Sequence, residues 1–337
     1  MPRLTLQQLR DRHAGIGSSD VAAILDVSPF DGSNPHGLFA EKSGPLELPE
    51  SCNECGGLGK HARGDDCDAC DGSGIAADDE DVAQALGHAV EPVLIRFYER
   101  RAGIKTEPGG TVYSAKYPWA FATVDAHEVG RLHGLEVKFV GGMMIRRWDK
   151  LLVDGVSHDV RVQNTWQMFV TGYERMTTIA MLGGPSGFQP FMVERDPELE
   201  GLVVPVVVKF WDDVKAGRAP AIDGSDECRA YLNQKYPPIA KDVEIEVSDP
   251  EIIALGIDHC TAANVIKDST AHRADVGNKI IAYMGQNGAT VAKCAEWRAI
   301  YRPNKKLIRS LRLVPLGELA QKASFGPTEQ GGDDDAF

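Results

Sequence analysis

The sequence lacks an excess of basic residues. Its 36 lysines and arginines are outnumbered by 49 aspartates and glutamates, which gives a formal net charge of −13. Contact with a polyanion would therefore need a local basic lining, because the surface as a whole repels one. The chain also has no apolar run of membrane-spanning length and no signal-peptide pattern at its start, so we expect a cytoplasmic protein with no membrane partner.

Cysteine is also scarce, and most of it is concentrated in one short segment. Of the seven cysteines, four form two C-x2-C pairs, Cys52 with Cys55 and Cys67 with Cys70, and eleven residues separate the pairs. Four thiolates at this spacing can complete a tetrahedral Zn²⁺ shell. The glycines that follow each pair permit the tight turns that direct backbone amides toward sulfur. We therefore expect one structural Zn²⁺ in this segment.

Two other interpretations of these cysteines remain. Disulfide bonds would need an oxidising compartment, which the expected cytoplasmic location disfavours. An iron–sulfur cluster also uses four cysteines, but paired glycine-rich knuckles are typical of zinc. The repeat C-x2-C-x-G-x-G resembles the cysteine-rich zinc modules of DnaJ-type chaperones over these 23 residues only, and the resemblance implies zinc rather than a chaperone activity. The role of the segment, whether structural, DNA-contacting or partner-docking, stays open.

A group of charged residues is expected to meet across a β-hairpin. Asp125 ends a predicted strand at 119–125, and a turn at 130–131 brings it beside Glu136. Because side chains alternate across a strand, Glu136 and Lys138 share one face. Two carboxylates there suit a hard divalent cation such as Mg²⁺, and the lysine can orient or deprotonate an attacking water. An ordinary charged surface hairpin would show the same loose pattern.

Predicted helices flank this hairpin and supply two more polar residues. Residues 82–101 carry apolar side chains at helical spacing, with Glu91 at the border of the apolar stripe. Pro92 disfavours helical geometry at Glu91, so we expect a kink or a new helix start there. After the hairpin, a second helix that ends near Gly172 exposes Gln163, which can hold a water or a phosphate oxygen. Solvated helix residues are the alternative interpretation of both side chains.

An ordered series of segments resembles the YqaJ-like viral recombinase family, relatives of the lambda-type phage exonuclease within the PD-(D/E)XK nucleases. The segments are RHAGIGSSDVAAILDVSPFDGSNPHGLFAEKSG, LGHAVEPVLIRFYERRAG, FATVDAHEVG, LEVKFVGG and VQNTWQMFVTG, which together cover roughly residues 10 to 220 apart from the cysteine insertion. The resemblance implies an α/β fold with a restriction-endonuclease-like core, in which helices flank a mixed central sheet. It also implies that a phage or a prophage of a bacterial host encodes the chain.

The resemblance assigns roles to the matching residues. The acids and the backbone carbonyl that would bind Mg²⁺ or Mn²⁺, followed by the catalytic lysine and the helix glutamine, are Glu91, Asp125, Glu136, Val137, Lys138 and Gln163. Arg12 and Ser19 match the pair that binds a 5′-terminal phosphate. The segment GIGSSD, which precedes a predicted helix at 20–25, supports this role because helix-start amides bind anions. Simple helix capping is the expected role of Ser18 and Asp20.

The chain is expected to divide into three parts. A nuclease core at 1–225 carries the zinc-binding insertion at 46–78, and the loop GRAPAIDGSDE marks its end. Residues 240–316 are expected to form a small helix-plus-hairpin unit, because a polar helical pattern precedes two strand-like runs. Residues 317–337 are small, polar and acidic, which is typical of a disordered tail.

These features predict a Mg²⁺-dependent 5′–3′ exonuclease that acts on linear double-stranded DNA and leaves 3′ single strands for a RecT-like annealing protein. Direction, partner and a homo-oligomeric state follow from the resemblance alone. Two alternatives remain. A PD-(D/E)XK endonuclease of repair or restriction type would also cut closed circles, and a non-catalytic zinc-containing recombination adaptor would bind DNA without cleaving it.

Overall fold

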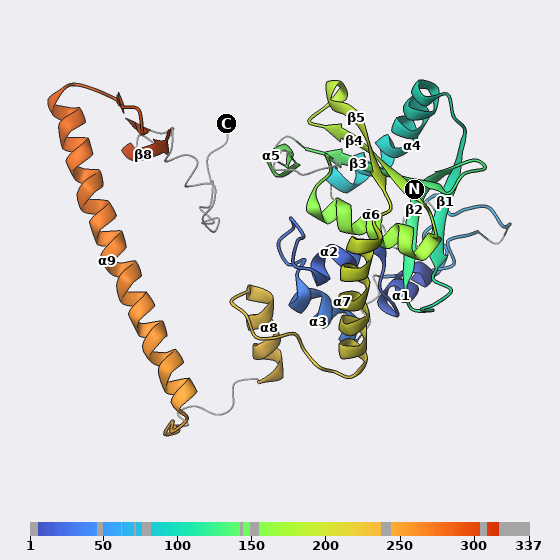
Figure 1. The fold of residues 1–337 in the computed structure, drawn as a ribbon, viewed down its shortest axis with the longest axis horizontal. Helices are drawn as coiled ribbons and strands as arrows, with labels where there is room; N and C mark the ends of the chain where they lie inside the picture. Colours follow the sequence, from blue (N-terminus) through green and yellow to red (C-terminus); the bar gives the residue numbers. More distant parts are fainter. Residues whose placement is uncertain are drawn as a thin grey trace. The chain divides into compact units, whose positions relative to one another are not determined.

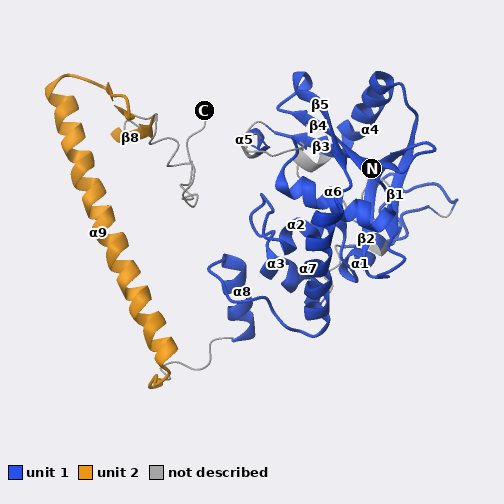
Figure 2. Ribbon diagram, viewed as in Figure 1, with its two compact units in different colours: residues 1–239 blue, residues 240–337 orange. Residues whose placement is uncertain are grey.

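The chain folds into two compact units, residues Met1–Ile239 and Ala240–Phe337 (Figure 2). The computed structural model describes residues 6–45, 50–61, 63–70, 72–75, 82–141, 144–148, 155–236, 244–303 and 309–316. Among these residues, none of the helices combines the length and the apolar character needed to cross a bilayer. The expected tail at 317–337 lies outside the described residues, as does part of the cysteine insertion at 46–78.

The first unit is built on a five-stranded mixed sheet whose strands follow one another in chain order (Figure 1). They are β1 (Thr106–Tyr113), β2 (Phe121–Glu128), β3 (His133–Val140), β4 (Arg175–Leu182) and β5 (Phe188–Glu194). The β1–β2, β2–β3 and β4–β5 pairs are antiparallel, whereas β3 and β4 are parallel. A parallel pair needs a crossover connection, and helix α6 (His158–Thr171) lies in that connection.

Two helices cover opposite faces of the sheet. Helix α4 (Val82–Ala102) buries Leu94 and Tyr98 against Leu135 of β3 and Ile179 of β4. Helix α6 lies against the other face, where Glu136, the next residue of β3, meets its side chains. This mixed α/β arrangement agrees with the nuclease-type core expected from the sequence.

A stack of indole rings fixes α6 to its neighbours. Trp166 is fully buried, and its ring Nε1 donates a hydrogen bond to the Phe121 carbonyl of β2 at 3.0 Å. Trp119 stacks between Trp166 and Trp211, with ring centroids 6.3 and 5.7 Å apart. Trp211 belongs to α7 (Pro197–Lys215), so the stack joins the segment before β2 to α6 and α7. Removing a core ring of this size typically costs about 3–5 kcal/mol.

Helix α4 runs through Pro92 as one helix, so the expected new helix start near Glu91 was wrong, whereas a kink there stays a prediction. A proline inside a helix removes one backbone hydrogen bond and crowds the preceding turn. Packing of Leu94 and Tyr98 on the sheet offsets this cost and keeps both halves in one helix. Helix α7 likewise continues through Pro205.

Short helices complete the first unit. They are α1 (Leu6–His13), the 3₁₀ turn η1 (Ser18–Asp20), α2 (Val21–Ile24), α3 (Pro35–Ser43), α5 (Ile145–Trp148), the 3₁₀ turn η2 (Pro185–Gly187) and α8 (Asp226–Lys235). Helix α8 packs against α3, and the Asn34 side chain donates to Glu227 at 2.7 Å. This contact explains why the first compact unit extends past residue 225 to Ile239.

The second unit contains α9 (Pro250–Gln286) and a three-stranded antiparallel sheet, β6 (Val291–Lys293), β7 (Trp297–Pro303) and β8 (Arg309–Pro315). The first of the two strand-like runs forms two strands rather than one. A turn at 294–296 divides it, and the N–H of Cys294 donates to the Trp297 carbonyl at 2.9 Å. Met284 of α9 is fully buried in this unit.

Candidate active site

The acids of the hairpin meet where β2 and β3 stop pairing. The last paired positions on that side are Ala126 and Leu135. Beyond them, Oδ2 of Asp125 accepts a hydrogen bond from the backbone N–H of Val137 at 2.7 Å. A side chain thus takes the place of a backbone acceptor, and the strands separate around it. The expected hairpin is present, although β2 continues three residues past Asp125 to Glu128.

Glu136 is the centre of the hydrogen-bond network. Its side chain is 7% exposed, and its Oε1 accepts from Nζ of Lys138 at 2.8 Å. Gln163 bridges the two residues, since its Oε1 accepts from Lys138 and its Nε2 donates to Glu136, both at 2.8 Å. The sequence predicted that Glu136 and Lys138 share a face, and the structure places both toward Gln163 of α6.

One residue of this network was missed by the sequence reasoning. Gln167 is fully buried, and its Nε2 donates to Oε2 of Glu136 at 2.7 Å and to the Thr123 carbonyl at 2.9 Å. The available signal was its spacing, because residues four apart lie on one helix face and Gln163 already pointed to the hairpin.

The electrostatics of the three acids fit a cation. Burial, followed by the charges of Glu136 and Glu91, raises the pKa of Asp125 well above its ordinary value. Burial and the Glu136 charge likewise raise the pKa of Glu91, which α4 contributes. Burial disfavours the charged form of a carboxylate, and the negative charge of a neighbouring carboxylate adds to this effect. Oxygen ligands of this kind suit Mg²⁺ or Mn²⁺ in their chemistry.

Lys138 keeps its charge in this setting. Burial opposes the charged form, but the ion pair with Glu136 prevails and raises the pKa of Lys138 above its ordinary value. Its side chain remains 28% exposed, so the ammonium group can reach a bound molecule. The arrangement therefore provides a fixed positive charge beside the carboxylates.

Arg12 and Ser19 are in contact, as the resemblance leads one to expect. The Arg12 guanidinium donates to Oγ of Ser19 at 3.1 Å. The expected helix after them is short, because only η1 and the four-residue α2 form. A helix of this length contributes little dipole, and binding of an anion at this turn stays a prediction.

A buried ion pair holds this segment in place. Lys42 of α3 has a side chain that is only 1% exposed, and its Nζ lies 3.1 Å from Oδ2 of Asp20. The same Nζ donates to the backbone carbonyl of Arg12 at 2.8 Å. Asp20 also accepts from the N–H of Gly17 at 3.0 Å, so it closes the turn before Ser19 rather than capping α2.

The four cysteines of the insertion converge on one point. Their Sγ atoms all lie within 4.8 Å of one another, with 3.9 Å between Cys52 and Cys67 and 3.7 Å between Cys55 and Cys70. A zinc–thiolate tetrahedron with bonds of about 2.3 Å has edges of about 3.8 Å. A disulfide would need about 2.05 Å. In a two- or four-iron cluster the four thiolates are divided among the irons, and thiolates on different irons lie farther apart. The spacing fits a single tetrahedral ion.

Glycines build the two knuckles as near-symmetric halves. Gly59 and Gly74 donate their N–H groups to Cys55 and Cys70 sulfur, each at 3.3 Å. Both glycines have positive φ, and a Cβ would lie 2.2 and 2.4 Å from a carbonyl oxygen of the other knuckle. Burial opposes the Cys55 thiolate, but the backbone N–H groups of Gly59 and Gly57, together with the neighbouring cysteines, lower the pKa of Cys55 to about 7. Burial raises the pKa of Cys67 to about 12, so four thiolates need a cation.

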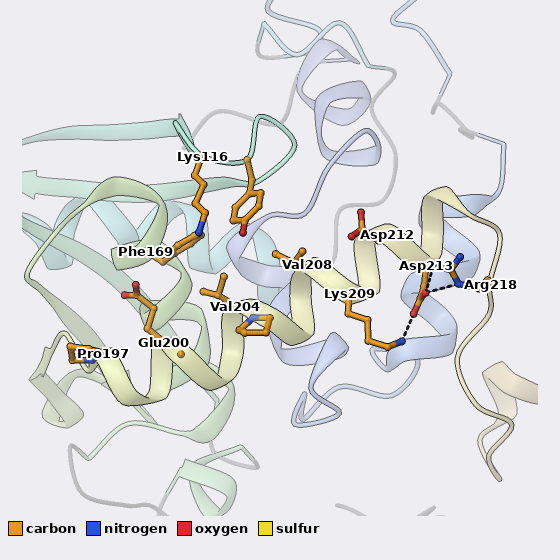
Figure 3. Close-up of a pocket in the computed structure, with 13 residues that line it drawn as sticks. Lys116, Phe169, Pro197, Glu200, Val204, Val208, Lys209, Asp212, Asp213 and Arg218 are labelled. Atoms are coloured by element: carbon orange, nitrogen blue, oxygen red, sulfur yellow. Dashed lines mark hydrogen bonds and ion pairs between the residues drawn. The ribbon is translucent and has the colours of Figure 1, made fainter.

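Two other features of the first unit do not belong to this site. A cavity of about 830 Å³ lies along α7, and Lys209 and Arg218, which both form ion pairs with Asp213, are among its lining residues (Figure 3). Glu91, Asp125 and Glu136 do not line this cavity. A cluster of His36, Asp223 and Cys228 has metal-ligand chemistry. However, Nε2 of His36 lies 2.8 Å from the Ala221 carbonyl, so it must carry a proton and offers no lone pair.

The fold and the site together define a mixed α/β domain that gathers acids and a lysine at a separated hairpin. Residues 7–174 match the sequence profile of the YqaJ-like viral recombinase domain, and the chain belongs to this family. A curated relative, the uncharacterized protein YqaJ of Bacillus subtilis (strain 168), is 25% identical over 242 residues. The match covers 71% of this chain and spans about two thirds (66%) of that protein.

Solved structures also resemble the chain. An alkaline exonuclease from Laribacter hongkongensis gives a TM-score of 0.45 at 16% identity, over 68% of this chain and 97% of that one. A phage-related exonuclease from Haemophilus somnus 129PT gives a TM-score of 0.32 at 11% identity, over 43% and 78% of the two chains. The family assignment itself rests on the sequence match.

Proposed function

We propose that the protein is a Mg²⁺-dependent deoxyribonuclease that removes nucleotides from the 5′ ends of linear double-stranded DNA. The observation that carries the proposal is the hydrogen-bonded network of Glu136, Lys138 and Gln163 at a separated hairpin, where Asp125 accepts from the backbone N–H of Val137. Membership of a viral recombinase family supports DNA as the substrate, and an exonuclease would provide the 3′ single strands that recombination uses.

The acids Glu91, Asp125 and Glu136 would hold Mg²⁺ or Mn²⁺. The carbonyl of Val137 is a further candidate ligand, because the N–H and C=O of one strand residue point to the same side and its N–H faces Asp125. When bound, the ion stabilises negative charge on the reacting phosphate and the leaving oxygen. The positive charge of the ion would offset the repulsion among these carboxylates.

Lys138 would act as a positively charged donor. Its raised pKa keeps it protonated at neutral pH, so it can orient the attacking water and offset charge on the phosphate. Gln163 holds the ammonium group in place through its Oε1. Water then attacks phosphorus in line, and the bond from phosphorus to the leaving oxygen breaks.

Arg12 and Ser19 would bind the 5′-terminal phosphate. Their contact places a guanidinium and a hydroxyl side by side, a donor pair that matches phosphate oxygens. The cysteine cluster would hold one structural Zn²⁺, because its sulfur spacing matches a single tetrahedral ion. A RecT-like annealing protein and further copies of the chain are the proposed partners in the cytoplasm of a phage host.

Three DNA substrates test this function together. With Mg²⁺, the protein should degrade one strand of linear duplex carrying 5′-phosphates, act more slowly on 5′-hydroxyl ends, and leave covalently closed circles intact. Cleavage of the circles would favour the endonuclease alternative. Binding of all three without cleavage, in Mg²⁺ or Mn²⁺, would favour the non-catalytic adaptor.

A further inference from the structure

The amide of Gln167 reaches the same carboxylate as Lys138 and Gln163, but from deeper in the core. Glu136 receives Lys138 and Gln163 on its Oε1 and Gln167 on its Oε2. Two glutamines of α6 that lie one turn apart therefore donate hydrogen bonds to the two oxygens of the Glu136 carboxylate.

The orientation of the Gln167 amide follows from its neighbours. Both groups that face its nitrogen, Oε2 of Glu136 and the carbonyl of Thr123, are acceptors. An amide oxygen turned toward them would face two acceptor oxygens, so the NH₂ group must point there and donate both of its hydrogens. The contact at 2.7 Å is thus a charge-assisted hydrogen bond with a defined direction.

The contacts leave a defined acceptor position on Glu136. A carboxylate has about four lone-pair sites, two on each oxygen. Lys138 and Gln163 use both sites of Oε1, and Gln167 uses one site of Oε2. The remaining site on Oε2 has no hydrogen-bond partner among the described residues, so a cation there would leave all three hydrogen bonds in place.

Gln167 is an unfavourable choice for a purely structural position. Its side-chain Oε1 is buried and has no hydrogen-bond partner within the described part of the chain. A buried acceptor without a partner lowers stability, and an apolar side chain of the same shape would avoid that cost. A role toward Glu136 accounts for an amide at this position.

We propose that Gln167 is a positioning residue that fixes Oε2 of Glu136 for binding of the catalytic divalent cation. The inference rests on the proposed function, since it concerns the same carboxylate. Hydrogen-bond partners of metal ligands typically change metal affinity or activity by about 10–100-fold when they are removed.

The test compares Gln167→Met with a matched control on the same helix. Methionine has nearly the same shape but cannot donate. Asn164 is the control, because it is also fully buried, also carries an acceptor without a partner, and donates to Thr178 rather than to Glu136. Mn²⁺ binding to the full, zinc-loaded chain is measured by electron paramagnetic resonance titration, and folding is checked by thermal melting in metal-free buffer.

Gln167→Met should bind Mn²⁺ about 10–100-fold more weakly and raise the Mg²⁺ needed for half-maximal cleavage by a similar factor. Asn164→Leu should lower the melting temperature and leave Mn²⁺ affinity unchanged. Gln167→Leu provides a second variant if methionine does not fold. Equal Mn²⁺ affinity in wild type and both Gln167 variants, or equal weakening by Asn164→Leu, would overturn the inference. A wild-type chain that neither binds Mn²⁺ nor cleaves DNA would instead remove the proposed function.

Discussion

Asp125 and Val137 are joined by a hydrogen bond of 2.7 Å from the backbone N–H to the carboxylate, at the point where β2 and β3 separate. This bond orients the Asp125 carboxylate. The Val137 carbonyl points to the same side of β3 as the Val137 N–H. The hairpin therefore presents a side-chain oxygen and a backbone oxygen to one space.

Asp125→Asn should separate the hydrogen bond that this side chain accepts from its negative charge. Asparagine can still accept from Val137, but it removes one of three repelling carboxylates. We expect cleavage to fall by about 10²–10³-fold or more, because the charge that binds the cation is lost. Without added divalent ions, stability should rise by about 1 kcal/mol, as judged by urea denaturation. Glu107→Gln, at an exposed site on β1, serves as the control and should change neither quantity.

Lys42→Met should destabilise the first unit strongly. It leaves Asp20, whose side chain is 11% exposed, without its cation, and breaking one partner of a buried pair typically costs about 3–5 kcal/mol. Chemical denaturation measures this loss. The double variant Lys42→Met/Asp20→Asn should recover much of it, because no buried charge remains unpaired. A single variant as stable as wild type would show that the pair does not organise the Arg12 segment.

Cys55→Ser should abolish the structural metal. We expect elemental analysis to find about one Zn²⁺ per chain in wild type and close to none in the variant, since three thiolates hold zinc poorly. Cys228→Ser is the matched control, because Cys228 is equally buried but lies outside the cluster. Iron in wild type, or retained zinc in Cys55→Ser, would contradict the assignment.

Asp196 should make the stability of α7 depend on pH. The backbone N–H of Leu199, aided by the nearby Arg161 guanidinium, holds the pKa of Asp196 below its ordinary value. A lowered folded pKa means that the contribution is complete above about pH 4 and disappears as pH falls through the folded value. The urea midpoint of Asp196→Ala should therefore lie below that of wild type at pH 7, and the two should converge in acid. A constant difference across this range would exclude the carboxylate as the cause.

The parts of the site that depend on local periodicity could be predicted from the sequence. Alternation along β3 places Glu136 and Lys138 together, and helical spacing places Gln163 on α6. The contacts that depend on packing could not. Gln167 meets Glu136 only because α6 lies on the sheet, and Lys42 reaches Asp20 only because α3 folds back onto the turn.

The same distinction applies to the fold. The ends of α4 and α6 follow from apolar spacing and from Gly172, which closes α6 with a positive φ of 77°. The unbroken course of α4 through Pro92 is decided by its burial against the sheet, which no local rule contains. The first strand-like run of the second unit is divided by a turn because its first part, β6, pairs with its second part, β7.

The central claim is that Lys138 and its carboxylate partners cleave DNA, and one substitution tests it most directly. Lys138→Ala removes the cation of Glu136, but Gln163 and Gln167 still donate to that carboxylate, so the fold should persist, as a melting curve can confirm. On linear duplex with 5′-phosphates and Mg²⁺, wild type should degrade one strand, whereas Lys138→Ala should be slower by about 10²-fold or more while still binding DNA. Lys116→Ala, which changes an exposed lysine that takes no part in the hydrogen bonds of Asp125 and Glu136, should behave as wild type. Equal degradation by wild type and Lys138→Ala would contradict the assignment of the active site.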